Sequence, residues 1–190
     1  MTRDLHLRAD AGIRTAGRSK PSDDPAMKVA SSTGTLRSSA LRTGLIAGAA
    51  ASLFSTMALF WTGRREVGSY TAPTNATSHW LWRDEALRVH SPTWRHTAIG
   101  YAIHHGTATF WAVLYAWLHG NRPAARSVPA ALTGAAIASA VACAVDYTIT
   151  PKRFTPGFEH HLSRRSMALV YAGFALGLAA GCLAANRRRD

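Results

Sequence analysis

The stretch "GLIAGAAASLFSTMALFW", residues 44–61, decides the fold. It has no charged side chain, and its only polar residues are Ser and Thr. In a helix that rises about 1.5 Å per residue, about 20 such residues cross the roughly 30 Å hydrocarbon core of a bilayer. A soluble helix bundle would instead need strongly polar residues on the outer face of each helix. We therefore expect a membrane-spanning helix here.

Three further runs lack Asp, Glu, Lys and Arg in the same way, namely 97–121, 127–145 and 166–186. The chain is thus expected to be all-α: an integral membrane four-helix bundle over residues 43–186. Its spans are predicted at about 43–62, 97–118, 127–148 and 166–186. Ser91 and Pro92 look like an N-cap followed by proline at the first helical position, so the second helix is expected to start there, ahead of the apolar run. The third is expected to end before Pro151, since proline stops a helix.

The two ends of the chain are basic. Residues 1–42 are rich in Ser, Thr, Gly and Arg and poor in large apolar residues, which predicts a disordered tail. A secretory signal is not expected, because the first apolar run starts late and no small-residue cleavage site follows it. Met27 is an acceptable alternative start, and residues 187–190, "RRRD", form a basic C-terminal end.

The first loop contains "TNATSHWLWRDEALRVHSP", residues 74–92, where Trp and Leu alternate with charged residues. This pattern is typical of a short interfacial helix that lies on the membrane surface. Trp80 and Trp82 in this segment, together with Trp61 at the end of the first span, are expected to anchor the chain at the headgroup level.

A net charge of +12 can indicate a nucleic-acid binder, but the basic residues here lie in the tail, the loops and the C-terminal end. We expect them to contact anionic lipid headgroups, and we expect no nucleic-acid partner. Lys and Arg near the span ends are about equally numerous on the two sides, so the rest of the basic tail decides the orientation. The prediction is a multi-pass protein of the inner (cytoplasmic) membrane with both termini in the cytoplasm.

Glycines recur four residues apart on two of the predicted spans: Gly44 and Gly48 on the first, and Gly173, Gly177 and Gly181 on the last. Such ridges of small residues let two helix backbones approach closely. They predict either tight packing within one chain or a homo-oligomer that forms through the ridges.

Ionisable and polar side chains gather at one end of the predicted bundle, because the second span starts there, the third ends there and the fourth starts there. They are Tyr101, His104, His105, Asp146, Glu159, His160 and His161. A carboxylate such as Asp146 inside a span costs about 2.5–3.5 kcal/mol, so it needs a partner, such as a His, Lys152 or Arg153. Adjacent helical residues point about 100° apart, so His104 and His105 are not expected to face one point.

This polar cluster leaves three functions open. The first is a structural or interaction protein of unknown biochemical role, in which the cluster specifies packing. The second is translocation of protons, small ions or solutes, because His and Asp relays titrate near neutral pH. The third is a membrane redox protein that binds haem or a divalent metal, with ligands drawn from His104, His105, Asp146, Glu159 and His160 or His161. We expect no cofactor. Enzymatic activity stays open, and no catalytic residue is named, because no nucleophile lies recognisably beside a base.

The order of features also resembles a group of bacterial inner-membrane proteins, the YagU-like family. The likeness rests on "GLIAG" (44–48) at the start of the first span, a His-bearing second span, a Gly- and Ala-rich third span and a "TPGFEHHLS" loop before the last. It covers residues 41–186. It implies a four-helix protein of the cytoplasmic membrane with a link to acid tolerance and no established reaction.

Overall fold

The computed structural model describes residues 25–187, with side chains from Ser38 onward, and this part of the chain is helical without any strand. The long helices are α1 (Pro25–Val67), α5 (Ile99–Tyr115), α6 (Val128–Thr148) and α7 (Arg164–Arg187). The short ones are α2 (Ala72–Thr77), α3 (His79–Trp82), α4 (Asp84–Leu87), and the single turns η1 (Trp94–Ala98), η2 (Ala116–Gly120), η3 (Pro123–Arg126), η4 (Lys152–Phe154) and η5 (Phe158–His160).

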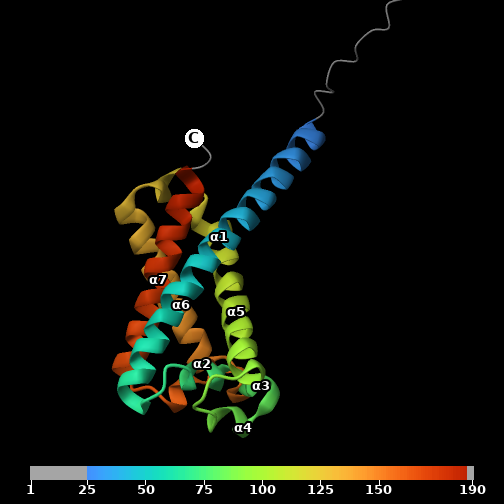
Figure 1. Cartoon of the computed structure of the whole chain (residues 1–190). Helices are drawn as coiled ribbons and strands as arrows, with labels where there is room; N and C mark the ends of the chain where they lie inside the picture. The colour runs from blue at the N-terminus through green and yellow to red at the C-terminus, as the bar shows by residue number, and fades with distance from the viewer. Residues whose placement is uncertain (1–24, 188–190) are drawn as a thin grey trace, which may run out of the picture.

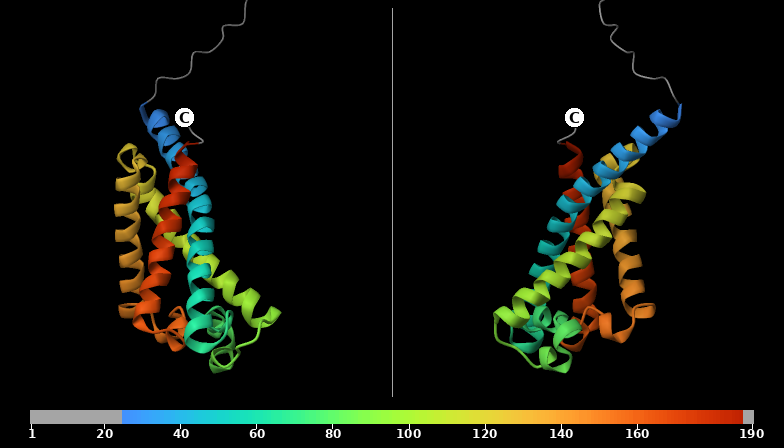
Figure 2. Two further views of the ribbon diagram at one scale, coloured as in Figure 1. Left: turned by 60° about the vertical axis from the view of Figure 1, so that its left-hand side comes forward. Right: turned by 90° about the vertical axis from the view of Figure 1, so that its right-hand side faces the viewer.

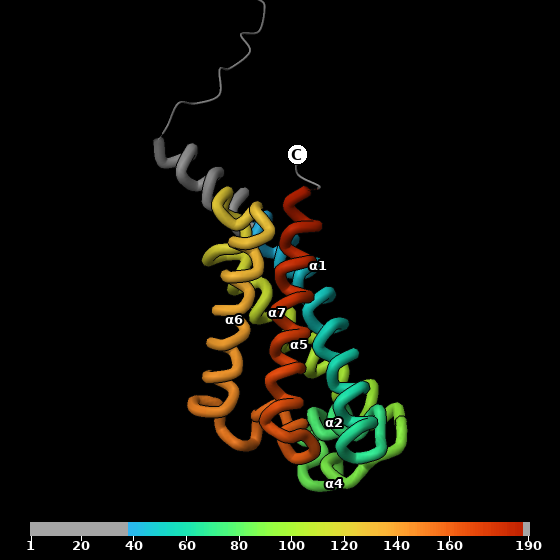
Figure 3. Tube along the Cα trace, turned by 90° about the vertical axis from the view of Figure 1, so that its left-hand side faces the viewer, coloured from blue at the N-terminus to red at the C-terminus, as the bar shows by residue number. Residues whose placement is uncertain are grey.

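The four long helices run side by side in alternating directions (Figure 1). α1 lies between α5 and α7, and α6 packs on the other side of α7, as the further views in Figure 2 show. In Figure 3 the neighbouring paths of α6, α7 and α1 can be followed in turn. α5 and α6 touch each other at few points.

Three helices are long and apolar enough to cross a membrane: α1 over Ser38–Val67, α6 and α7. α5 has only 17 residues, but the π-helical turns η1 and η2 adjoin it at its two ends. The helical path of this segment is therefore continuous from Trp94 to Gly120.

α1 begins at Pro25, well before the span that the sequence predicts from residue 43. Residues 25–42 are thus helical, whereas a disordered tail was predicted as far as residue 42. Extending an existing helix needs no new nucleation, so an apolar helix can draw in the polar residues that precede it. The remainder of the predicted tail, residues 1–24, and residues 188–190 of the basic C-terminal end lie outside the described residues.

The glycine ridges lie against neighbouring helices of the same chain. A Cβ on Gly173, Gly177 or Gly181 would come within about 3.0 Å of the α1 backbone. A Cβ on Gly44 would meet the Cα of Val113 on α5 at 2.5 Å, and one on Gly48 would meet the Cα of Thr109 at 2.6 Å. The ridge of Gly44 and Gly48 thus sets how closely α1 approaches α5. The ridge of Gly173, Gly177 and Gly181 sets how closely α7 approaches α1.

Helix starts follow local capping chemistry. Ser127 caps α6: its hydroxyl accepts a hydrogen bond from the Ala130 backbone N–H. The second long segment starts at Trp94 instead of Pro92, because Thr93 is its cap and accepts from the His96 N–H.

Residues 69–97, which we call the loop unit, fold into the end of the bundle. The sequence predicts one interfacial helix here, whereas the structure has the three short helices α2, α3 and α4. All six residues of α2 are buried, so α2 belongs to the protein interior. Asn75 is fully buried and holds the unit together: its amide donates to the carbonyls of Val89 and Ser91, and its carbonyl accepts from Thr97 Oγ1 at 2.7 Å.

A carboxylate joins the end of α1 to the start of α7. Glu66 accepts hydrogen bonds from the Ser163 N–H at 2.6 Å, from the Ser163 hydroxyl at 2.7 Å and from the Ser166 hydroxyl. Negative charge at a helix N-terminus is favourable, because the first backbone N–H groups lack helical partners. This contact fixes where α7 begins relative to α1.

Candidate functional site

Both histidines of the adjacent pair bind serines of α1. His104 Nε2 lies 2.8 Å from Ser55 Oγ, and His105 Nδ1 lies 2.8 Å from Ser52 Oγ. Ser52 and Ser55 are nearly one helical turn apart, so two side chains that diverge from α5 still reach the same neighbouring helix. The Tyr101 ring lies beside His105, with ring centroids 5.9 Å apart. The pair therefore helps to join α5 to α1.

The hydrogen bonds of Ser55 indicate the tautomer of His104. The Ser55 hydroxyl lies 2.8 Å from the Ala51 carbonyl and donates its single hydrogen there. The bond to His104 then requires the ring to donate from Nε2. In the neutral ring this leaves Nδ1 as the acceptor, with a lone pair that Ser55 does not use.

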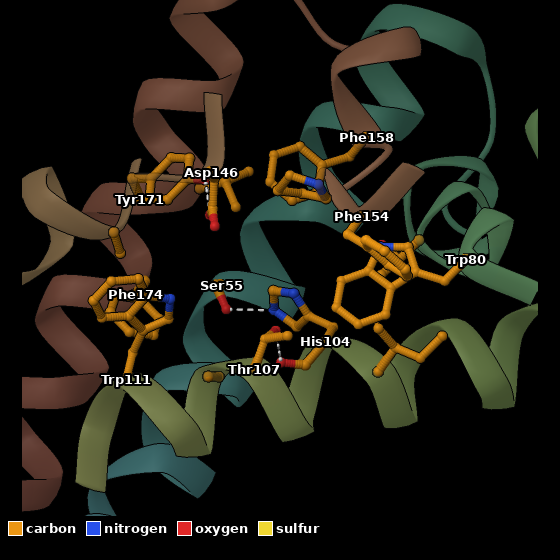
Figure 4. Close-up of a pocket in the computed structure, with 16 residues that line it drawn as sticks. Ser55, Trp80, His104, Thr107, Trp111, Asp146, Phe154, Phe158, Tyr171 and Phe174 are labelled. Carbon is orange, nitrogen blue, oxygen red and sulfur yellow. Dashed lines mark hydrogen bonds between the residues drawn. The ribbon is translucent and has the colours of Figure 1, made fainter. Parts of the chain in front are cut away.

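His104 and Asp146 line the same cavity, on facing walls in Figure 4. Its volume is about 60 Å³, and a single water needs about 10–15 Å³, so there is room for roughly four water-sized groups. Six aromatic side chains contribute to the wall: Trp80, Trp111, Phe154, Phe158, Tyr171 and Phe174. No Lys or Arg occurs among the described residues that line it. Of the two histidines, His104 is the one that shares a cavity with Asp146.

Asp146 is held by a tyrosine of α7. The Tyr171 hydroxyl donates to Asp146 Oδ2 at 2.6 Å. The partners expected from the sequence are occupied elsewhere: Arg153 donates to the Trp80 carbonyl at 2.7 Å, and Lys152 is exposed. The turn η4 places both basic residues on the loop, whereas Asp146 points into the bundle.

The "EHH" sequence of the second large loop does not line the cavity. Glu159 accepts a long hydrogen bond of 3.4 Å from the Tyr147 hydroxyl, and His160 is exposed. His161 meets His90 of the loop unit edge to face, with ring centroids 5.3 Å apart. Burial, with smaller contributions from His90 and His160, lowers the pKa of His161. The predicted cluster therefore divides into a bundle part and a loop part.

No group of three or more His, Cys, Asp or Glu side chains suited to a metal ion occurs between residues 38 and 187. Asp146 and His104 contribute only two of the ligands named for a metal. The expectation that the protein carries no cofactor stays a prediction.

The three tryptophans expected at the membrane surface have different environments. Trp61 is exposed, with the Arg65 guanidinium 4.6 Å from its ring centroid. Trp82 is covered in the same way by Arg95, at 4.2 Å. Trp80 instead lines the cavity and donates its indole N–H to the Thr155 carbonyl at 2.9 Å. Arginine over an indole face is a favourable cation–π contact, so Trp61 and Trp82 keep the surroundings expected near headgroups.

Sequence reasoning missed the residues that complete the site. Ser52 and Ser55 stand out only as polar residues spaced three apart in an apolar run. Tyr171 and the aromatic residues of the wall carry no distinguishing signal, since aromatic residues are common in spans and loops alike.

The chain matches no protein-family model, no curated protein and no solved structure. The resemblance to YagU-like proteins therefore stays an expectation, and the proposals below depend on the geometry of the site.

Proposed function

We propose that this chain is a four-span integral membrane protein that binds a small organic cation, an ammonium group, in the cavity beside Asp146. One observation carries the proposal: a carboxylate points into a cavity with six aromatic side chains and neither Lys nor Arg among the described residues of its walls. Aromatic faces attract ammonium groups, and a desolvated site strengthens that attraction. An ionised Asp146 carboxylate in an apolar environment is costly, so a bound cation that pairs with it stabilises it.

His104 fits the same ligand class. A neutral imidazole with a free acceptor nitrogen does not repel a cation, and it can accept a hydrogen bond from a primary or secondary ammonium. The Ser55 contact keeps the ring in the cavity wall. A buried Lys or Arg in its place would favour an anionic ligand instead.

Four spans are part of the proposal. The continuous helical path from Trp94 to Gly120 has at its centre the 17 residues of α5, none of which is Asp, Glu, Lys or Arg, and this supports a fourth crossing beside α1, α6 and α7. With four crossings, both termini lie on one side. We place the protein in the inner membrane. We place both termini in the cytoplasm, because the tail is basic.

Binding can be measured directly. Isothermal titration of the protein in lipid nanodiscs with tetramethylammonium should give saturable binding, and Asp146→Asn should weaken it at least tenfold. Glu159→Gln is the matched control, since that carboxylate lies nearby but outside the cavity wall, and it should bind as the wild type does. A folded wild type without saturable binding, or equal affinity in Asp146→Asn, would refute the proposal.

Translocation is the second candidate, because His104 and Asp146 line one cavity inside the bundle. Proteoliposomes should then show a flux of protons or of the bound cation that Asp146→Asn and His104→Ala abolish. Absence of flux under an imposed gradient would limit the role to binding.

A further inference from the structure

A long apolar groove runs between α5 and α6, where these helices touch at few points. Its volume is about 600 Å³, ten times that of the cavity beside Asp146. Among the described residues, its walls carry no Asp, Glu, Lys or Arg and consist of side chains such as Leu114, Leu118, Ile137 and Val141. On the far side from the loop unit it reaches His119 and Pro129.

The groove continues from the cavity along the same two helices. Trp111 of α5 lines both, and on α6 the groove ends at Val141 where the cavity begins at Ala142. The Tyr115 hydroxyl, which donates to the Ala131 carbonyl at 3.3 Å, bridges the two helices along its length. The cavity with its one carboxylate and the apolar groove therefore lie end to end along α5 and α6, with Trp111 in the wall of both.

The length of the groove matches a single lipid chain. From Trp111 to His119 the α5 wall extends about 12 Å, and from Pro129 to Val141 the α6 wall extends about 18 Å. The near end of the groove, at Val141, lies about 8 Å along α6 from Asp146, and its far end lies in the first turn of α6, so the groove extends past the midplane of the bilayer. Because Asp146 is near the end of α6, a head group bound there would lie close to the membrane surface, with its chain directed toward the midplane.

We propose that the ligand is an amphiphile, a long-chain ammonium lipid whose head group binds beside Asp146 and whose hydrocarbon chain lies in the groove between α5 and α6. This inference rests on the proposed function, because the head group is the cation of that proposal. It adds that the ligand enters sideways from the bilayer, through the gap between the two helices. Because lipid tails are as apolar as the groove, the added affinity comes from van der Waals packing of the chain against the groove wall and not from the hydrophobic effect.

The test compares two cations with the same head group, radiolabelled tetramethylammonium and hexadecyltrimethylammonium, on the protein in lipid nanodiscs. Nanodiscs that contain the Asp146→Asn variant measure how much of each cation partitions into the lipid without binding at Asp146. We expect the long-chain cation to bind at least tenfold more tightly. Thr133→Phe, which adds bulk at an exposed position of the groove wall, should remove most of that advantage and leave tetramethylammonium binding unchanged.

Leu132→Phe is the control, because Leu132 is an exposed neighbour on α6 that does not line the groove. Tetramethylammonium binding without a chain-length advantage, or an advantage that Thr133→Phe leaves intact, would overturn this inference and spare the proposed function. Failure of both cations to bind would overturn the two together. A dimer that Thr133→Phe dissociates would place a second copy in the groove and exclude the lipid.

Discussion

At the scale of the residue, His161 makes the stability of the loop contact depend on pH. Its pKa is lowered, mainly by burial and then by His90 and His160. Near and below the ordinary value of about 6.5 the unfolded chain therefore binds more protons than the folded chain, so the free energy of unfolding falls as the pH falls. Above that value His161 contributes no pH dependence. Below its lowered folded-state pKa the loss levels off.

Thermal unfolding between pH 8 and pH 5 measures this effect. We expect the midpoint of the wild type to fall as the pH drops below about 6.5. His161→Gln should flatten that part of the profile, and the exposed His160→Gln should change it less. A profile of His161→Gln that is parallel to that of the wild type would show that other groups cause the dependence.

The sequence identifies some residues of the site and not others, for a physical reason. Asp146 and His104 stand out because ionisable groups are expensive inside an apolar span. Tyr171 and Phe158 do not stand out in the sequence, because their places beside Asp146 and in the cavity wall depend on which helix packs against which loop. The Asp146 partner was predicted as a His, Lys152 or Arg153 but is Tyr171, since a hydroxyl on the neighbouring helix is nearer than a loop cation.

At the scale of the helix, the α1–α7 contact should depend on the missing side chain of Gly177. A Cβ there would lie 2.5 Å from the Ala50 carbonyl oxygen and 2.6 Å from the Ala51 Cα, so the two backbones would have to separate. Gly177→Ala should lower the thermal midpoint, with a destabilisation of about 1–3 kcal/mol as for other overpacked interiors.

Gly106 of α5 provides the control, because a Cβ there meets nothing within 4 Å. Gly106→Ala should leave the stability unchanged or raise it by up to about 1 kcal/mol, since Ala is the better helix former. If both substitutions had the same effect, helix propensity and not packing would explain the result at Gly177.

Helix positions were predictable where apolar runs and caps coincide, and less so elsewhere. The charge-free run from Ser127 and the stop at Pro151 place α6 within a residue. The loop unit was predicted as one surface helix, but helices of four to six residues carry no clear periodicity, and Asn75 draws them inward through three hydrogen bonds. The burial of Asn75 depends on partners 14 and 16 residues away, Val89 and Ser91, which the local sequence does not specify.

At the scale of the whole molecule, the number of crossings determines where the ends of the chain lie. If the segment Trp94–Gly120 spans the bilayer together with α1, α6 and α7, the two termini are on the same side. If only the three helices that are long enough by themselves cross, the termini are on opposite sides. Reporter fusions at the two ends therefore distinguish four spans from three.

We expect fluorescent-protein fusions at residue 1 and at residue 190 both to report a cytoplasmic location. A reporter inserted at Gly68, which is exposed with a positive φ of 70° and open space around it, should lie on the opposite face. Termini on opposite sides would contradict the four-span proposal. Two external termini would agree with four spans but reverse the orientation. The basic tail would then not be what sets the orientation.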